Sequence, residues 1–248
     1  IGSRFFIITV LAFLLVFSAL HFTLEVAILH PMASILAHRI FESDAGQWER
    51  TAFILHGIWG SGRNWTSMAK RLVRAYPRWR FITVDLPGHG ESRMPPGHWT
   101  VARCAEALAD LAAHHPPQVV IGHSFGGKVA LAYGGRATSS LVSIWVLDSP
   151  LDTGQTATGN ETIRAVRDAI NTLPIPAPSR ESVVEHFTSR GLEKAVAFWM
   201  TTNLRRETDG FHWRFQPALV EALLHDYARV DGWMMLESLR KRLSIHLV

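Results

Sequence analysis

The sequence feature that most constrains the fold is a short apolar run that leads directly into Gly-x-Ser-x-Gly. Residues 119–121 are Val-Val-Ile, which favour a buried strand, and residues 122–126 supply the motif with Ser124 at its centre. Residues 128–133 then favour a helix. A serine between a strand and a helix must lie in a sharp turn, where its hydroxyl is exposed and can serve as a nucleophile. The flanking glycines are expected where a Cβ would crowd that turn.

Two earlier segments have the same form, an apolar strand followed by a glycine-rich turn. Residues 53–60 are Phe-Ile-Leu-His-Gly-Ile-Trp-Gly, and residues 81–92 are Phe-Ile-Thr-Val-Asp-Leu-Pro-Gly-His-Gly-Glu-Ser. In this order the three segments resemble the α/β-hydrolase family, which carries His-Gly-x-x-Gly, then Asp-x-x-Gly-His-Gly-x-Ser, then Gly-x-Ser-x-Gly. The resemblance covers about residues 34–248. It implies an α/β fold with a mostly parallel sheet, helices on both faces and a helical lid inserted over the active site.

The pattern along the chain agrees with this fold class as far as Pro150. Strands are expected at 35–41, 51–55, 81–84, 119–121 and 142–147, with helices at 64–75 and 101–112. Strands separated by helices imply a parallel sheet covered on both faces. After Pro150 no strand is predicted before residue 241, and helices are expected at 162–171, 180–189, 192–204, 217–227 and 232–241.

Four parts of the chain follow from these patterns. Residues 1–31 are a hydrophobic N-terminal segment, and residues 32–150 are the hydrolase core with the nucleophile turn. Residues 151–240 are the helical lid, and residues 241–248 are the start of the next core strand. Within the lid, residues 202–214 resemble the lid of a subfamily of small ester hydrolases found in bacteria and mitochondria. The aromatic residues and Met234 of this part are expected to line the lid or to attach it to the sheet.

The N-terminal segment allows two interpretations. Residues 5–20 form a strongly apolar run, shorter than the roughly 20 residues of a membrane-spanning helix. Extending the run to residues 5–29 includes His21 and Glu25, which are costly in lipid. The segment is therefore either a signal or membrane anchor, or sequence upstream of a true start at Met32. The first interpretation implies an anchored or exported protein, and the second a cytoplasmic or organellar one.

Composition excludes several classes of function. The formal net charge is +4, but the basic residues are scattered, so no nucleic-acid partner is predicted. Cys104 is the only cysteine, which excludes an intrachain disulfide, and its place on the apolar side of a helix indicates a core residue. The 13 histidines are dispersed without zinc-type spacing. Neither a metal nor a cofactor is predicted.

The resemblance assigns roles to residues at the ends of three strands. Ser124 is the expected nucleophile, attacking a carboxylic ester or thioester to form an acyl-enzyme. The backbone N–H of Phe125 is the first expected oxyanion-hole donor. The second comes from the loop after His56-Gly57, with Ile58 as the first choice and Trp59 as the alternative.

In this family the serine acts together with an acid and a histidine base, and these two residues are harder to place in the sequence. Asp148 ends the strand after the nucleophile turn, where some members of this fold place the acid, although a turn-capping aspartate would have the same position. His56 and His89 match positions that brace loops in the family. His123 lies inside the turn, and its side chain is expected to point away from the Ser124 hydroxyl. Asp85 is expected to order its own turn.

Residues 244–248 are expected to form a strand. In the order typical of this fold the acid follows that strand and the histidine follows one more, so the chain as written is expected to be truncated and nearly inactive. Two rivals to the esterase remain. One is another chemistry on the same fold, such as a haloperoxidase or a C–C bond hydrolase. The other is a non-catalytic protein that keeps the pocket to bind a small ligand.

A protein that begins at Met32 is expected to be at least as soluble as the whole chain. The reason is that Pro31 separates the apolar run from the first strand, and all three motifs lie downstream. The soluble fraction after expression at one temperature measures this. Aggregation that is cured by restoring residues 1–31 would contradict it.

Overall fold

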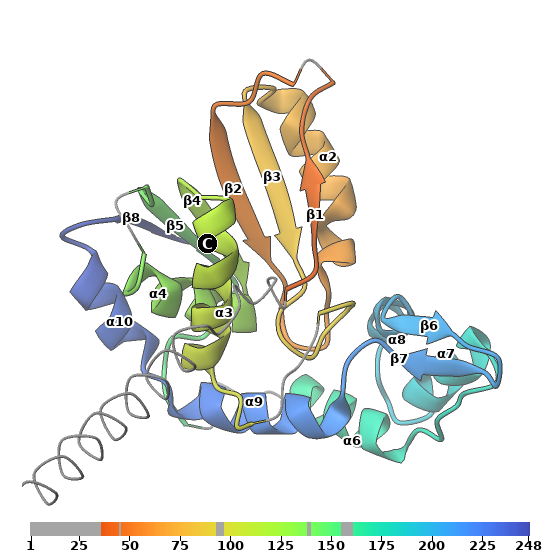
Figure 1. Cartoon of the computed structure of the whole chain (residues 1–248). Coiled ribbons are helices and arrows are strands. Elements are labelled where there is room, and N and C mark those ends of the chain that lie inside the picture. The colour runs from red at the N-terminus through yellow and green to blue at the C-terminus, as the bar shows by residue number, and fades with distance from the viewer. Residues whose placement is uncertain (1–35, 45, 93–96, 138–139, 155–160) are drawn as a thin grey trace, which may run out of the picture. The chain divides into compact units, whose positions relative to one another are not determined.

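The computed structural model describes residues 36–44, 46–92, 97–137, 140–154 and 161–248. Its centre is a six-stranded sheet of order β1-β3-β2-β4-β5-β8 (Figure 1). β1 runs antiparallel to β3, and every other neighbouring pair is parallel, as the sequence predicts. The strands are β1 (His38–Phe41), β2 (Arg50–Leu55), β3 (Trp79–Val84), β4 (Val119–His123), β5 (Ser143–Leu147) and β8 (Ser244–Leu247).

Helices cover both faces of this sheet because alternate strand residues point to opposite sides. On one face of the sheet, the helix α2 (Thr66–Ala75) packs against Ala52, Ile54 and Phe81. The intervening residues belong to the larger core formed with α3 (Val101–His114) and α4 (Phe125–Gly134). The predicted helix at 64–75 begins with a 3₁₀ turn, η1 (Gly62–Trp65). The Thr100 side chain caps α3 by accepting from Arg103 N–H at 3.1 Å.

The segment after β5 contains the predicted helices, and it also contains a β-hairpin that the sequence analysis missed. The helices are α6 (Glu161–Thr172), α7 (Arg180–Thr188), α8 (Lys194–Thr201), α9 (Pro217–Arg229) and α10 (Gly232–Leu239). In Figure 1 the hairpin lies beside α7 and α8, and its strands are β6 (Leu204–Arg206) and β7 (Phe211–Trp213).

The prediction of an all-helical segment is therefore wrong between α8 and α9. The expected helix at 192–204 ends at Thr201, and Leu204 pairs with Trp213 across the hairpin. Strands of three residues are too short to show an alternating pattern in the sequence. The turn between them depends on Gly210, which has a φ of 143°, a value that residues other than glycine rarely adopt.

β8 lies at one edge of the sheet and β1 at the other. The strand predicted at 244–248 is confirmed at Ser244–Leu247, parallel to β5. The backbone N–H of Asp148 donates to Val248 O at 2.8 Å, which extends the pairing by one residue.

In the part of the chain that the structure describes, no helix has the length and apolar character needed to cross a membrane. The apolar segment at residues 5–29 lies outside the described residues, so the two interpretations of it stay predictions.

Candidate functional site

Ser124 occupies the turn between β4 and α4 with a strained backbone. Its φ of 50° and ψ of −117° lie in a region that few non-glycine residues adopt. The turn is tied to the next strand, because Ser124 N–H donates to Leu147 O at 2.9 Å. It is closed by Gly127 N–H, which donates to Ser124 O at 2.8 Å. The sharp turn that the sequence predicts is therefore present.

Three glycines surround the turn because no Cβ fits there. A Cβ on Gly122 would lie 2.2 Å from the carbonyl oxygen of Gly126, and one on Gly126 would lie 2.7 Å from that of His56. On Gly57 a Cβ would lie 3.2 Å from Ser124 Cβ, so the loop after β2 is directly against the serine. The sequence prediction of crowding at Gly122 and Gly126 is confirmed.

Gly122→Ala is expected to destabilise the protein by about 3 kcal/mol or to prevent folding, because its Cβ would overlap a backbone atom that cannot move freely. Gly135→Ala is the matched control. Gly135 has helical φ and ψ, and its Cβ would meet only a contact at 3.4 Å, so the control is expected to change stability by less than about 1 kcal/mol. Urea unfolding measures both. Equal stabilities would show that the turn relaxes around an added methyl group.

Trp59 and Asp148 share the unusual backbone of Ser124. Among the described non-glycine residues, these three have positive φ, at 63° for Trp59 and 43° for Asp148. They follow β2, β4 and β5, so they lie at the carboxyl edge of three neighbouring strands. Strained residues persist where the surrounding structure holds them, and they cluster at functional sites.

Backbone N–H groups at this edge are available to a ligand. Gly60 N–H donates to Gly57 O at 3.0 Å, which places Ile58 and Trp59 in the middle of a tight turn. Phe125 is the first residue of α4, where N–H groups lack helical partners. Within the described residues, the N–H groups of Ile58, Trp59 and Phe125 donate no hydrogen bond. The side chains of these three residues are buried in the core.

A cavity of about 580 Å³ lies beside the turn. The loop after β2, η1, the end of β4 and the end of α8 contribute its lining, which is His56, Gly57, Gly60, Arg63, Asn64, Trp65, His123, Trp199 and Thr202. Asn64 Nδ2 donates to Thr202 Oγ1 at 3.1 Å across it. Of the aromatic residues expected to line the lid or to attach it to the sheet, Trp199 lines this cavity, whereas Trp213 and Phe215 are buried and Trp233 is exposed.

His56 and Asp85 brace the loops around the site, as predicted. His56 Nδ1–H donates to Gly57 O at 2.8 Å, and its Nε2 accepts from Leu86 N–H at 2.9 Å. Asp85 accepts from Gly62 N–H at 2.6 Å and from Glu91 N–H at 3.0 Å. These bonds join the loop after β2 to the loop after β3, and they occupy both ring nitrogens of His56.

His89 has the same bracing character and is fully buried. Its Nδ1–H donates to Pro87 O at 3.0 Å, and its backbone pairs with Phe215. Burial lowers the pKa of His56 to about 4 and that of His89 to about 3. Both rings are therefore neutral in the folded protein at pH 7.

These two histidines are expected to make the protein sensitive to acid. Below pH 6.5 an unfolded chain protonates both rings, whereas the folded protein keeps them neutral down to about pH 4 and 3. The unfolded state then binds more protons. The histidine contribution to stability is complete above pH 6.5 and is lost as pH falls, by up to about 1.4 kcal/mol per pH unit for each ring.

Urea unfolding between pH 7 and about pH 4.5 measures this dependence. His89→Gln should reduce the slope by about one proton, and His98→Gln, at an exposed position, should leave it unchanged. A slope that is the same in His89→Gln and in the parent protein would contradict the assignment.

Asp148 lies at the predicted edge without a fixed partner. It is exposed and follows β5, and its carboxylate forms no hydrogen bond to the described residues. Burial lowers the pKa of His123, and the Asp148 carboxylate opposes this effect, so the two groups lie close enough to interact. The roles of Asp148 as acid and of Ser124, Phe125 and Ile58 in catalysis stay predictions.

Ser149 and Tyr227 contact the turn, and the sequence analysis missed both. Ser149 Oγ–H donates to Ser124 O at 2.7 Å, and Tyr227 Oη lies 3.2 Å from Ser149 Oγ. Ser149 could have been predicted to lie beside the site, because it follows Asp148 just after the end of β5. Tyr227 could not, because 78 residues separate it from Ser149.

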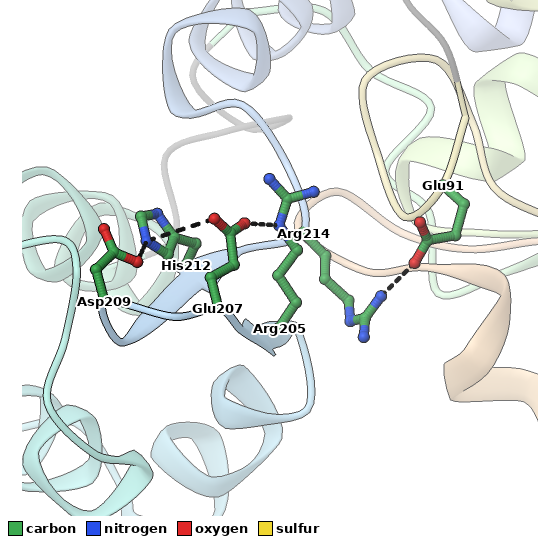
Figure 2. A network of polar contacts seen from close by, with 6 residues as sticks. All are labelled: Glu91, Arg205, Glu207, Asp209, His212 and Arg214. Atoms are coloured by element: carbon green, nitrogen blue, oxygen red, sulfur yellow. Dashed lines mark hydrogen bonds and ion pairs between the residues drawn. The ribbon is translucent and has the colours of Figure 1, made fainter.

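Figure 2 shows a polar network around the β6–β7 hairpin, made of Glu91, Arg205, Glu207, Asp209, His212 and Arg214. Glu207, Asp209 and His212 bring their ligand-type atoms within 4.8 Å of one another, a grouping that the sequence analysis did not predict. His212 Nε2 lies 2.8 Å from Asp209 Oδ1, and both carboxylates are exposed. Arg214 pairs with Glu91 in the loop after β3. Ion pairs between exposed side chains are screened by water and contribute little to stability.

The comparison with known families agrees with this architecture. A family model described as the alpha/beta hydrolase family matches residues 52–244. The chain belongs to the alpha/beta hydrolase family. A solved structure titled "Marine microorganism esterase" superposes with a TM-score of 0.72 and 18% identity, covering 86% of this chain and 90% of that one. At that identity the likeness shows the shared alpha/beta hydrolase fold.

Curated alpha/beta hydrolase relatives are more similar in sequence and longer. The sn-1-specific diacylglycerol lipase ABHD11 of Danio rerio is 28% identical over 199 residues, which cover 77% of this chain and 60% of the relative. The Mus musculus protein of the same name is 31% identical over 172 residues, which cover 64% of this chain and 53% of that protein. Lipase LipV of Mycobacterium tuberculosis is 32% identical over 122 residues, or 48% of this chain and 43% of the relative. The chain thus spans little more than half the length of the first two.

Proposed function

We propose that this protein is a serine hydrolase that cleaves carboxylic esters or thioesters through an acyl-enzyme on Ser124. The observation that carries the proposal is the strained turn at Ser124, held against the Gly57 loop beside a cavity. In this proposal the turn is a nucleophile elbow, and residues 151–240 form a lid. The names of the relatives support it, since they are lipases.

The first half of the reaction follows from the proposed roles. Ser124 Oγ attacks the carbonyl carbon of the substrate, its proton passes to a base, and the carbonyl oxygen becomes an oxyanion. Phe125 N–H and the N–H of Ile58 or Trp59 are the proposed donors to that oxyanion. Each donor is worth about 3 kcal/mol of transition-state stabilisation. Collapse of the intermediate breaks the bond from the carbonyl carbon to the leaving oxygen or sulfur, which takes the proton back from the base. An alcohol or a thiol is released, and the acyl group stays on Ser124.

The second half repeats the two proton transfers, with water in place of Ser124 as the nucleophile. Water attacks the acyl-enzyme, gives one proton to the base, and the released acid leaves Ser124 with its hydroxyl restored. We assign the base to none of the described histidines. Both nitrogens of His56 are occupied, and His89 is fully buried. Among the described residues, no histidine forms a hydrogen bond with Ser124 or Asp148. In this fold the base follows the acid in the chain, and Asp148 is the proposed acid.

Ser124→Ala in the whole protein is expected to abolish labelling by a fluorophosphonate, because the covalent bond forms at the serine oxygen. Hydrolysis of a short p-nitrophenyl ester should fall by at least about 1000-fold. Ser238→Ala, at an exposed serine on α10, is the control and should change neither. Gel fluorescence and a spectrophotometric assay measure the two effects.

Three results would overturn the proposal in different ways. Persistent labelling of Ser124→Ala would move the nucleophile to another residue. Labelling without turnover of any ester or thioester would favour another chemistry on the same fold. Tight binding of a small ligand by a protein that is neither labelled nor active would favour the non-catalytic interpretation.

A further inference from the structure

The segment between β5 and β8 is joined to the sheet through two lengths of chain that lie side by side. We call residues 150–154 and 227–232 together the neck. Gly154 N–H donates to Ala228 O at 2.6 Å, and Gly232 N–H donates to Leu151 O at 2.8 Å. A Cβ on Gly232 would lie 2.8 Å from the Leu151 side chain, so the two lengths are in close contact.

A lysine of the nucleophile helix ends inside this neck. Lys128 lies on α4, four residues after Ser124, and is fully buried. Its Nζ donates to Asp152 O at 2.8 Å, to Tyr227 O at 3.0 Å and to Val230 O at 2.8 Å. The first acceptor belongs to one length of the neck and the other two to the second. One ammonium group therefore holds both lengths.

The three acceptors suit a buried cation. Tyr227 O and Val230 O lie at the C-terminal end of α9, where carbonyls lack helical partners and positive charge is favoured. The ammonium also lies 4.2 Å from the centre of the Tyr227 ring. An ammonium has three N–H donors, and all three are used here. An apolar side chain in its place would leave the carbonyls without partners at a cost typical of buried polar groups.

Tyr227 continues the connection from Lys128 to the turn. Its hydroxyl lies 3.1 Å from Pro150 O and 3.2 Å from Ser149 Oγ, and it can donate its one proton to either oxygen. Ser149 in turn donates to Ser124 O at 2.7 Å. The ring of Tyr227 also lies against that of Phe125, with centroids 5.8 Å apart. The end of α9 thus contacts the turn through a hydroxyl pair and through an aromatic pair.

We propose that Lys128 is a positioning residue that clamps the neck onto the nucleophile helix and, through Tyr227 and Ser149, holds the turn at Ser124. The positioning role rests on the proposed function of Ser124. The clamp itself does not, because it is a set of contacts within the fold. A loose neck would let α9 and the residues that follow it shift relative to the turn, and small misplacements of a nucleophile cost rate.

The charges around Lys128 keep it protonated at neutral pH. Burial lowers the pKa of Lys128 to about 8, and the carboxylates of Asp152 and Asp231 oppose this effect. Tyr227 is neutral there, since burial raises its pKa to about 12. The ammonium is therefore the main form at pH 7, with its three donors intact.

The test compares Lys128→Met with Lys194→Met in the whole protein. Lys194 is exposed on α8, so its variant is the matched control for the loss of one lysine. Hydrogen exchange at the amides of Gly154 and Gly232 reports on the neck, and amides in β2 and β4 report on the sheet. Lys128→Met is expected to speed neck exchange by at least about tenfold relative to the sheet. Fluorophosphonate labelling of Ser124 should slow by at least about tenfold. Lys194→Met should change neither.

The two readouts separate the clamp from the proposed chemistry. Neck exchange that is unchanged in folded Lys128→Met would overturn the clamp, whatever the activity. Faster neck exchange with an unchanged labelling rate would overturn the positioning role while leaving the clamp. If the parent protein is not labelled at all, the proposed function fails, and the exchange measurement still decides the clamp.

A second variant decides the case in which Lys128→Met does not fold. Tyr227→Phe removes one hydroxyl and keeps the backbone carbonyl that Lys128 contacts. It is expected to slow labelling by about three- to tenfold with unchanged exchange at Gly154 and Gly232, because the hydroxyl contacts with Ser149 and Pro150 are lost while the three hydrogen bonds of Lys128 stay. Tyr76→Phe, at an exposed tyrosine, is its control. A labelling rate equal to that of the control would overturn the proposed connection to the turn.

Discussion

The close contact of three backbone segments around Ser124 is the constraint on which the rest of this site depends. The turn after β4 fits between the loop after β2 and the end of β5 because Gly57, Gly122 and Gly126 have no side chain. That crowding holds Ser124 at a positive φ, and the N–H groups of Ile58 and Trp59 in the neighbouring loop find no acceptor among the described residues. The paired strands of the sheet hold this strained backbone in place, because their parallel register puts the ends of β2, β4 and β5 at one edge.

Lys128 ties the segment that follows β5 to the helix that begins at the Ser124 turn. A buried charge is stable only where enough acceptors surround it, and here the acceptors come from both lengths of the neck. The helix that begins at the Ser124 turn therefore carries the lysine that contacts both lengths of the neck. This arrangement makes the geometry at Ser124 depend on residues about 100 positions later in the chain.

The turn, the sheet and the loop-bracing roles of His56 and Asp85 could be predicted because each depends on short segments with strong local signals. The β6–β7 hairpin could not, since its strands are too short for an alternating pattern. Lys128 was missed for a different reason. A lysine on a helix normally faces solvent, and its burial here is decided by acceptors 24, 99 and 102 residues away. The base for Ser124 likewise has no assignment among the described residues.

A crystal structure of the whole protein after reaction with a phosphonate inhibitor decides whether Ser124 is the nucleophile and which N–H groups face the oxyanion. The adduct copies the tetrahedral intermediate at the nucleophile. We expect phosphorus bonded to Ser124 Oγ, and a phosphonyl oxygen within about 2.7–3.1 Å of Phe125 N and of the N of Ile58 or Trp59. Phosphorus on any other residue, or a phosphonyl oxygen that faces solvent away from these N–H groups, would contradict this assignment.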